Sequence, residues 1–179
     1  MNCKNIFITA VVLSLTGCSS TPKYNESNEV VEHTQISFRN TVNKADTSSF
    51  RFLDSNGDVV NRYDAKVGIS KGGKVNLYFE GYAHQGSQKL CTFTNLPTST
   101  VYKINGQNVQ MLEFCSRPSD STTATYSSAA AETDVGKEYI DSQFRNYKSV
   151  IVEYRNGARV SFDSDGYENA MKVSGGNAL

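Results

Sequence analysis

The stretch Ser149–Phe162, SVIVEYRNGARVSF, decides the fold class of this 179-residue chain. Residues 149–154 and 159–162 each place an apolar side chain at every second position, which is the period of a half-buried β-strand. Between them lie Asn156 and Gly157, a pair that readily adopts the positive φ values of a tight hairpin turn. The stretch therefore predicts two antiparallel strands with one buried face.

The same two-residue period recurs upstream. One Asn-Gly pair within residues 54–58 and another at residues 105–106 each separate two runs of alternating apolar side chains. Each pair predicts a further hairpin. Additional strands are expected at residues 35–39, 74–82 and 89–93, where β-branched and aromatic side chains are frequent.

Near the C-terminus the period changes to that of a helix. A stripe of apolar side chains is expected to pack against the sheet, and Thr133 or Asp134 can cap its first turn. The stripe consists of Val135, Tyr139, Ile140, Phe144 and Tyr147. A second, short helix is expected to start near Asp165, where a capping-box spacing begins, and to stop at Gly175 and Gly176.

These elements predict an α+β domain, mainly an antiparallel β-sheet of six to eight strands, with one amphipathic helix and a short C-terminal helix. Residues 116–131, SRPSDSTTATYSSAAA, contain mostly Ser, Thr and Ala and little apolar bulk. We expect this segment to form a long exposed loop, which is uncommon unless the loop is mobile or functional. A loop that includes one edge strand at residues 123–127 is the alternative.

The first residues have the build of a secretory signal. Lys4 supplies a positive charge, and residues 6–15 form an apolar run of about ten residues. Such a run is too short to span a bilayer, which needs roughly 20 apolar residues, but it fits a cleaved signal. It ends in Leu15-Thr16-Gly17-Cys18, which resembles the lipobox of bacterial lipoproteins. An ordinary secretory signal that contains a cysteine, or an internal apolar segment, is the alternative.

The lipobox resemblance implies a cleaved and acylated protein. Residues 1–17 would be removed, Cys18 would carry the lipid, and residues 18–31 would form a polar, flexible tether. A single domain would follow at residues 32–179, because no second linker or internal repeat divides it. Ser19 stands where an aspartate would retain such a protein in the inner membrane. The resemblance therefore implies the outer membrane, with the domain facing the periplasm or the cell exterior.

Apart from Cys18, and from Cys3 within the signal, the chain has two cysteines, Cys91 and Cys115. An even pair in an exported protein predicts a disulfide, and the closed loop of about 25 residues would contribute roughly 3.5 kcal/mol in the chain-entropy model. A redox-active thiol or a metal ligand is the competing interpretation. Neither finds support, because the chain has no C-x-x-C motif and only two histidines.

Composition argues against a nucleic-acid partner. The full chain has 18 basic and 18 acidic residues, and removal of the signal would take one basic residue and leave a net charge of −1. The basic residues are scattered and form no stripe interleaved with aromatics, which a nucleic-acid-binding surface would show.

No catalytic or metal-binding motif is recognisable. The G-x-S-x-G motif of serine hydrolases does not occur in the sequence. The segment Asp54–Asp58 superficially resembles a calcium loop, but its glycine is fourth rather than sixth, so a hairpin turn is the better interpretation. We therefore expect no enzyme activity, no cofactor and no metal site.

The sequence favours a binding protein of the cell envelope, held to the membrane by its lipid. A protein or other macromolecular partner would meet strand edges, hairpin tips or the segment 116–131, and Tyr82, His84 and Tyr126 are the candidate binding residues. A second hypothesis is a carrier or sensor for a small ligand, held in a cavity of a β-barrel-like domain. A third is a hydrolase, in which His84 would face a carboxylate and a serine.

Overall fold

The computed structural model describes residues 32–38, 47–53, 59–83, 90–94, 96–117 and 125–176. These residues form nine strands and two helices. In chain order the elements are β1 (Glu32–Ile36), β2 (Thr47–Leu53), β3 (Val59–Ile69), β4 (Val75–Ala83), β5 (Thr98–Ile104), β6 (Gln107–Ser116), β7 (Thr125–Ala131), α1 (Asp134–Asn146), β8 (Ser149–Glu153), β9 (Arg159–Asp163) and α2 (Tyr167–Gly176).

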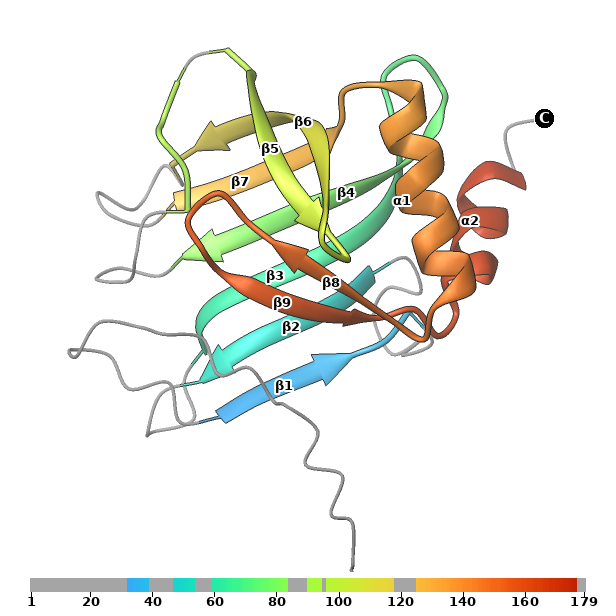
Figure 1. Ribbon diagram of the computed structural model, residues 1–179, viewed down its shortest axis with the longest axis horizontal. Helices are drawn as coiled ribbons and strands as arrows, with labels where there is room; N and C mark the ends of the chain where they lie inside the picture. The colour runs from blue at the N-terminus through green and yellow to red at the C-terminus, as the bar shows by residue number, and fades with distance from the viewer. Residues whose placement is uncertain are drawn as a thin grey trace, which may run out of the picture.

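The strands form one antiparallel sheet that curls into a nearly closed barrel (Figure 1). Their order is β1-β2-β3-β4-β7-β6-β5-β8-β9. At the seam, the side-chain amide of Gln35 on β1 donates a hydrogen bond to the carbonyl oxygen of Ser161 on β9 at 2.9 Å. The predicted α+β class with a mainly antiparallel sheet is confirmed. The predicted count of six to eight strands is wrong, because the described part of the chain has nine.

Strand β7 shows that the expectation of a long exposed loop at residues 116–131 is wrong for residues 125–131, whereas residues 118–124 lie outside the described residues. It pairs with β4 on one side and β6 on the other, so it lies inside the sheet and not at an edge. Its inward side chains, Thr125, Ser127 and Ala129, are buried. This part of the interior is narrow, since a Cβ on Gly81 of β4 would come within 3.1 Å of the Ser127 hydroxyl oxygen. Small side chains fit there, but they produce no apolar alternation in the sequence.

The hairpins indicated by Asn-Gly pairs are present where the structure describes them. Asn105 and Gly106, with φ values of 48° and 87°, join β5 to β6. Gly157, with a φ of 84°, lies in the turn between β8 and β9. β2 and β3 also pair in antiparallel fashion, although the turn expected at residues 54–58 lies outside the described residues.

The strand expected at residues 89–93 is wrong, because the described residues 90–94 pair with no strand. Leu90 and Cys91 are both buried, whereas successive side chains of a strand point to opposite faces. The segment instead turns inward, and Leu90 occupies the space beside Gly81, where a Cβ would lie 2.9 Å from the Leu90 Cδ1.

Helix α1 begins as predicted, with the Thr133 hydroxyl accepting a hydrogen bond from the Gly136 amide at 3.1 Å. Its buried row is Gly136, Ile140 and Phe144. The predicted stripe is therefore wrong at both ends, because Val135 is 78% and Tyr147 is 55% exposed. A Cβ on Gly136 would lie 3.0 Å from Val109, so the glycine lets α1 approach β6 and turn this row inward.

Both helices lie at one end of the barrel, which we call the helix end (Figure 1). Aromatic rings fasten them to the sheet, since Phe144 lies 5.1 Å from Tyr167 of α2 and 6.2 Å from Phe79 of β4, measured between ring centroids. Helix α2 includes Gly175 and Gly176, which were expected to stop it. The opposite end, where β1, β3 and β7 begin and β2, β4 and β6 finish, we call the disulfide end.

Replacement of Phe144 by alanine is expected to destabilise the domain by about 3–5 kcal/mol, because it removes a buried ring from between the helices and the barrel. Equilibrium unfolding in urea, followed by circular dichroism, measures the loss. Val135→Ala on the same helix is the matched control, and it should change the free energy of unfolding by no more than about 0.5 kcal/mol. Equal losses from the two variants would contradict the described burial of α1.

Candidate interaction surface

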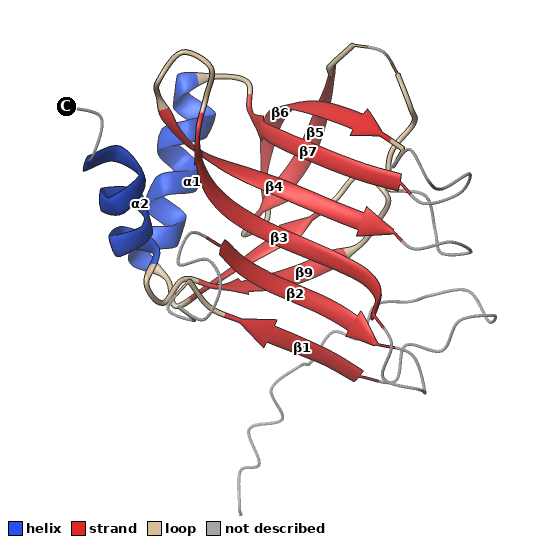
Figure 2. Ribbon diagram, turned by 180° about the vertical axis from the view of Figure 1, so that it is seen from behind, coloured by secondary structure: helices blue, strands red, loops and turns tan. Residues whose placement is uncertain are grey.

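The outer face of β3, β4, β7 and β6 is covered by neither helix (Figure 2). Side chains alternate along each strand, so every second one points away from the barrel. In β6 the alternation is regular, with Val109, Met111, Glu113 and Cys115 buried and the side chains between them exposed. Outward apolar side chains on these strands therefore meet solvent or a partner.

Five outward side chains occupy neighbouring positions across this face and onto the adjacent strand β5. This diagonal band consists of Val101, Leu112, Phe114, Tyr126 and Tyr82. Tyr126 pairs with Tyr82 on one side and with Ser116 on the other, and Phe114 precedes Ser116 by two residues on the same face. Leu112 and Val101 are diagonal neighbours across the β5–β6 pair. Val101 is 53% exposed, and Leu112 and Phe114 are each 43% exposed.

The β4 and β7 end of the diagonal band is built from two tyrosines. The ring centroids of Tyr82 and Tyr126 lie 4.8 Å apart, and the guanidinium carbon of Arg62 lies 4.1 Å from the Tyr82 centroid. Arg62 is held in turn by Asp64, at 2.9 Å between Nε and Oδ2. Partial burial, and secondly the charge of Glu80, raise the pKa of the Tyr126 hydroxyl well above its ordinary value. Tyr126 therefore presents a neutral ring, and its contacts hold it in place.

The structure brings together two of the three predicted binding residues. Tyr82 and Tyr126 are in ring contact, but they lie on β4 and β7 rather than in a loop. His84 lies outside the described residues, so its role in binding or in catalysis stays a prediction. Sequence reasoning missed Leu112 and Phe114, because alternation alone does not say which face of a strand is buried.

The predicted disulfide between Cys91 and Cys115 is present, with the two Cα atoms 5.9 Å apart. Cys115 is an inward residue of β6, so the bridge fastens the irregular segment 90–94 to the end of that strand. Just beyond β6, the guanidinium carbon of Arg117 lies 5.9 Å from the centroid of the Phe93 ring. The bridge thus holds the chain two residues before Phe93, whose ring is exposed.

Aromatic rings fill the described interior of the barrel. Tyr63 and Tyr102 both pack on Tyr154, at 4.7 and 4.8 Å between centroids. Phe79 contacts Tyr102 and Phe162 at 6.5 and 6.0 Å. All five rings are buried. This packing gives no support to the hypothesis of a small-ligand cavity inside the barrel.

A buried carboxyl group lies among these rings. Glu113 is 2% exposed, and its Oε1 accepts a hydrogen bond from the Tyr102 hydroxyl at 2.8 Å. Burial raises the pKa of Glu113, and this outweighs the opposite effects of the Tyr102 hydrogen bond and of the Arg155 charge. Sequence reasoning missed this acid, although it occurs in phase with the inward positions Met111 and Cys115 of the same strand.

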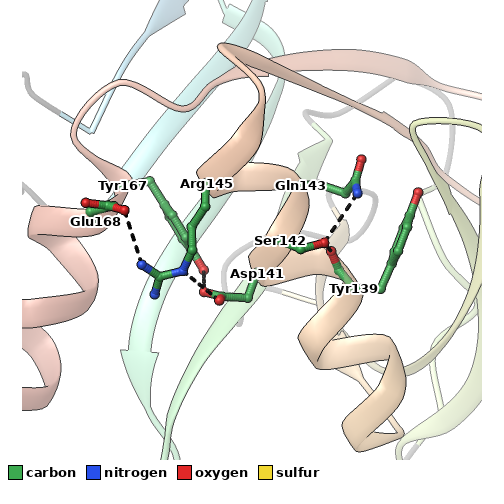
Figure 3. A network of polar contacts seen from close by, with 7 residues as sticks. All are labelled: Tyr139, Asp141, Ser142, Gln143, Arg145, Tyr167 and Glu168. Carbon is green, nitrogen blue, oxygen red and sulfur yellow. Dashed lines mark hydrogen bonds and ion pairs between the residues drawn. The ribbon is translucent and has the colours of Figure 1, made fainter.

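A groove with a volume of about 390 Å3 lies at the helix end, between the two helices and the start of β4. Beside it, Asp141 accepts hydrogen bonds from the Arg145 Nε at 2.7 Å and from the Tyr167 hydroxyl at 2.9 Å (Figure 3). Arg145 also reaches Glu168 of α2, at 3.4 Å. The charged groups of this network contact one another, and Asp141 and Arg145 of α1 contact Tyr167 and Glu168 of α2. The network therefore joins the two helices.

Among the described residues, no three His, Cys, Asp or Glu side chains gather in a way that could hold a metal ion. Neither helix of the described chain is long and apolar enough to cross a membrane. No protein-family model, curated protein or solved structure matches the chain. The function therefore has to be inferred from the geometry of the surface and from the N-terminal motif.

Glu113→Gln is expected to make the stability of the domain less sensitive to pH. Because burial raises the pKa of Glu113, the folded protein binds this proton more tightly than the unfolded chain does, and the wild type loses stability as the pH rises through that pKa. Glutamine keeps an acceptor for the Tyr102 hydroxyl but has no proton to lose. Urea unfolding between about pH 4 and pH 8 measures the free energy of unfolding. As the pH rises, this free energy should increase for the variant relative to the wild type.

The control for this experiment is Glu138→Gln, which removes a carboxylate from an exposed position on α1. A difference between Glu113→Gln and the wild type that stays constant over the whole pH range would contradict the effect of burial on Glu113.

Proposed function

We propose that this protein is a lipoprotein of the bacterial outer membrane that acts without catalysis, by binding another macromolecule of the envelope or the cell exterior. The diagonal band is the observation that carries the binding role. It joins five apolar or aromatic side chains across four strands, on a face that neither helix covers. The lipobox at Leu15–Cys18 supports the anchoring.

The chemistry of the diagonal band suits a protein partner. Burial of exposed apolar surface by a partner contributes a favourable free energy of about 25 cal/mol per Å2. Tyrosine and arginine are frequent at the energetic centre of protein interfaces, and a tyrosine ring loses little conformational entropy on binding. Tyr82, Tyr126 and Arg62 supply such groups, and their mutual contacts arrange them in advance.

A tethered domain needs an exposed surface that can cover part of a partner. This holds whether its role is accessory, inhibitory or one of exclusion. The diagonal band offers such a surface. The alternative role, that of a carrier for a small ligand inside the barrel, has less support because buried rings occupy the described interior.

In cells that express the full-length precursor, metabolic labelling with palmitate is expected to mark the protein. The label should be lost in Cys18→Ala, because the lipobox cysteine is the residue acylated in proteins with this type of signal. Cys3→Ala, within the same signal, is the control and should keep the label. Label that persists in Cys18→Ala would contradict acylation at this site.

Photo-crosslinking in living cells tests the diagonal band. The photo-reactive amino acid benzoylphenylalanine, in place of either Leu112 or Phe114, is expected to form an adduct with the same envelope protein. The matched control carries the probe in place of Val135, which is exposed at the helix end. Tyr126→Ser should lower the adduct yield of the probe at Leu112 by at least about fivefold, because an aromatic side chain at an interface centre contributes more than about 1 kcal/mol.

Two outcomes of the crosslinking would overturn the binding role of the diagonal band. One is the absence of adducts from both band positions. The other is an equal yield of the same adduct from the control position on α1.

A further inference from the structure

Two exposed apolar side chains lie close together in the chain, just after the disulfide-bonded Cys91. Phe93 is 51% and Leu96 is 74% exposed. The positive charge of Arg117 lies over the Phe93 ring, 5.9 Å from its centroid. These side chains are not members of the diagonal band. They precede β5, whose first residue pairs with the last part of β6, and Phe93 lies against Arg117 just beyond β6, so they lie toward the disulfide end of the barrel.

The chain that leads into Phe93 is held by a disulfide and by a buried neighbour. Cys91 is bonded to Cys115, and the neighbouring Leu90 is 5% exposed. The Thr94 hydroxyl donates a hydrogen bond to the Leu96 carbonyl at 2.6 Å. The disulfide and the buried Leu90 hold the chain just before Phe93 in place.

The same end of the barrel receives the chain from the N-terminus. β1 starts at Glu32, whose backbone partner is Leu53, the last residue of β2. Figure 2 shows that β1 begins at the end where β4 and β6 finish. The fourteen residues 18–31 reach at most about 50 Å when fully extended, and a flexible chain of that length spans roughly 20 Å root mean square. A lipid on Cys18 would hold the disulfide end within this distance of the membrane.

We propose that Phe93 and Leu96 enter the membrane surface and form a second, non-covalent contact between the domain and the lipid. This inference rests on the lipid anchoring proposed above. Two apolar side chains bind a bilayer weakly by themselves, but a covalent anchor raises their local concentration at the membrane. Arg117 reaches the lipid phosphates with its charged group while the apolar pair occupies the boundary of the acyl chains.

A lipid surface fits this pair better than a protein partner does. The side chains lie at the end of the barrel that the anchor keeps close to the membrane, and the diagonal band on the side of the barrel provides the larger apolar area for a protein. With Phe93 and Leu96 in the bilayer surface, the band stands beside the membrane and stays open to a partner.

Tryptophan fluorescence tests the contact, because the natural chain contains no tryptophan. Phe93→Trp is expressed in its acylated form and reconstituted into vesicles of phosphatidylethanolamine with a minority of phosphatidylglycerol, some of whose acyl chains are brominated. We expect the emission of this variant to shift to the blue and to be quenched by the bromines. Val135→Trp, at the helix end, is the matched control and should show neither effect.

Two further variants refine the test. Leu96→Ser in the Phe93→Trp chain should lower the quenching, because it removes half of the apolar pair. Arg117→Gln should lower the quenching more in vesicles that contain phosphatidylglycerol than in vesicles without it, because only the former carry a net negative charge.

Vesicle flotation distinguishes failure of the contact from failure of the anchor. Protein that floats with the vesicles but shows no quenching at Phe93→Trp, or equal quenching at Val135→Trp, would overturn the membrane contact and leave the anchor intact. Acylated preparations that do not float would overturn both proposals. Flotation together with quenching confined to Phe93→Trp supports both.

Discussion

The ring of Phe79 joins the main parts of this domain. It points inward from the middle of β4, has no exposed surface, and contacts Tyr102 of β5, Phe162 of β9 and Phe144 of α1. Edge-on and tilted ring pairs of this kind add about 0.5–1.5 kcal/mol to the gain from burial alone. Phe79 lies on β4, and its partners come from two strands in the other half of the sheet and from a helix. This one packed ring therefore holds the two halves of the barrel and α1 together.

The choice of which side chains point into the barrel also determines which side chains point outward. With Phe79 inside, its neighbours Tyr78 and Glu80 point outward, and a register slip of one residue would exchange the two faces. In β6 the same rule places Glu113 among the interior rings and Phe114 on the surface. The diagonal band is therefore a consequence of the core packing, and it needs no separate scaffold.

Local signals in the sequence predicted the turns at residues 105–106 and 156–157, the start of α1 and the disulfide. Asn105 and Gly106 adopt the positive φ values that an Asn-Gly turn requires, and the Thr133 cap depends on atoms within one helical turn. The failures concern packing between distant segments. β7 has small side chains because Gly81 and Ser127 approach closely, and the buried row of α1 is set by contact with Val109. Such contacts leave no periodic pattern in the sequence. For the same reason, the sequence did not show that Leu112 and Phe114 lie on the outer face of the candidate surface.

The seam of the barrel bears on when the domain can fold. Gln35 on the first strand reaches Ser161 on the last strand, and only α2 follows in the described chain. Contacts this distant in sequence make folding slow, because long stretches of chain must be ordered before the contacts form. A ribosome that has made only the first eight strands holds a sheet whose seam is still open. Closure of the barrel therefore waits until β9 has been made, and this order suits the proposed lipoprotein, which would cross a membrane in an unfolded state and fold afterwards.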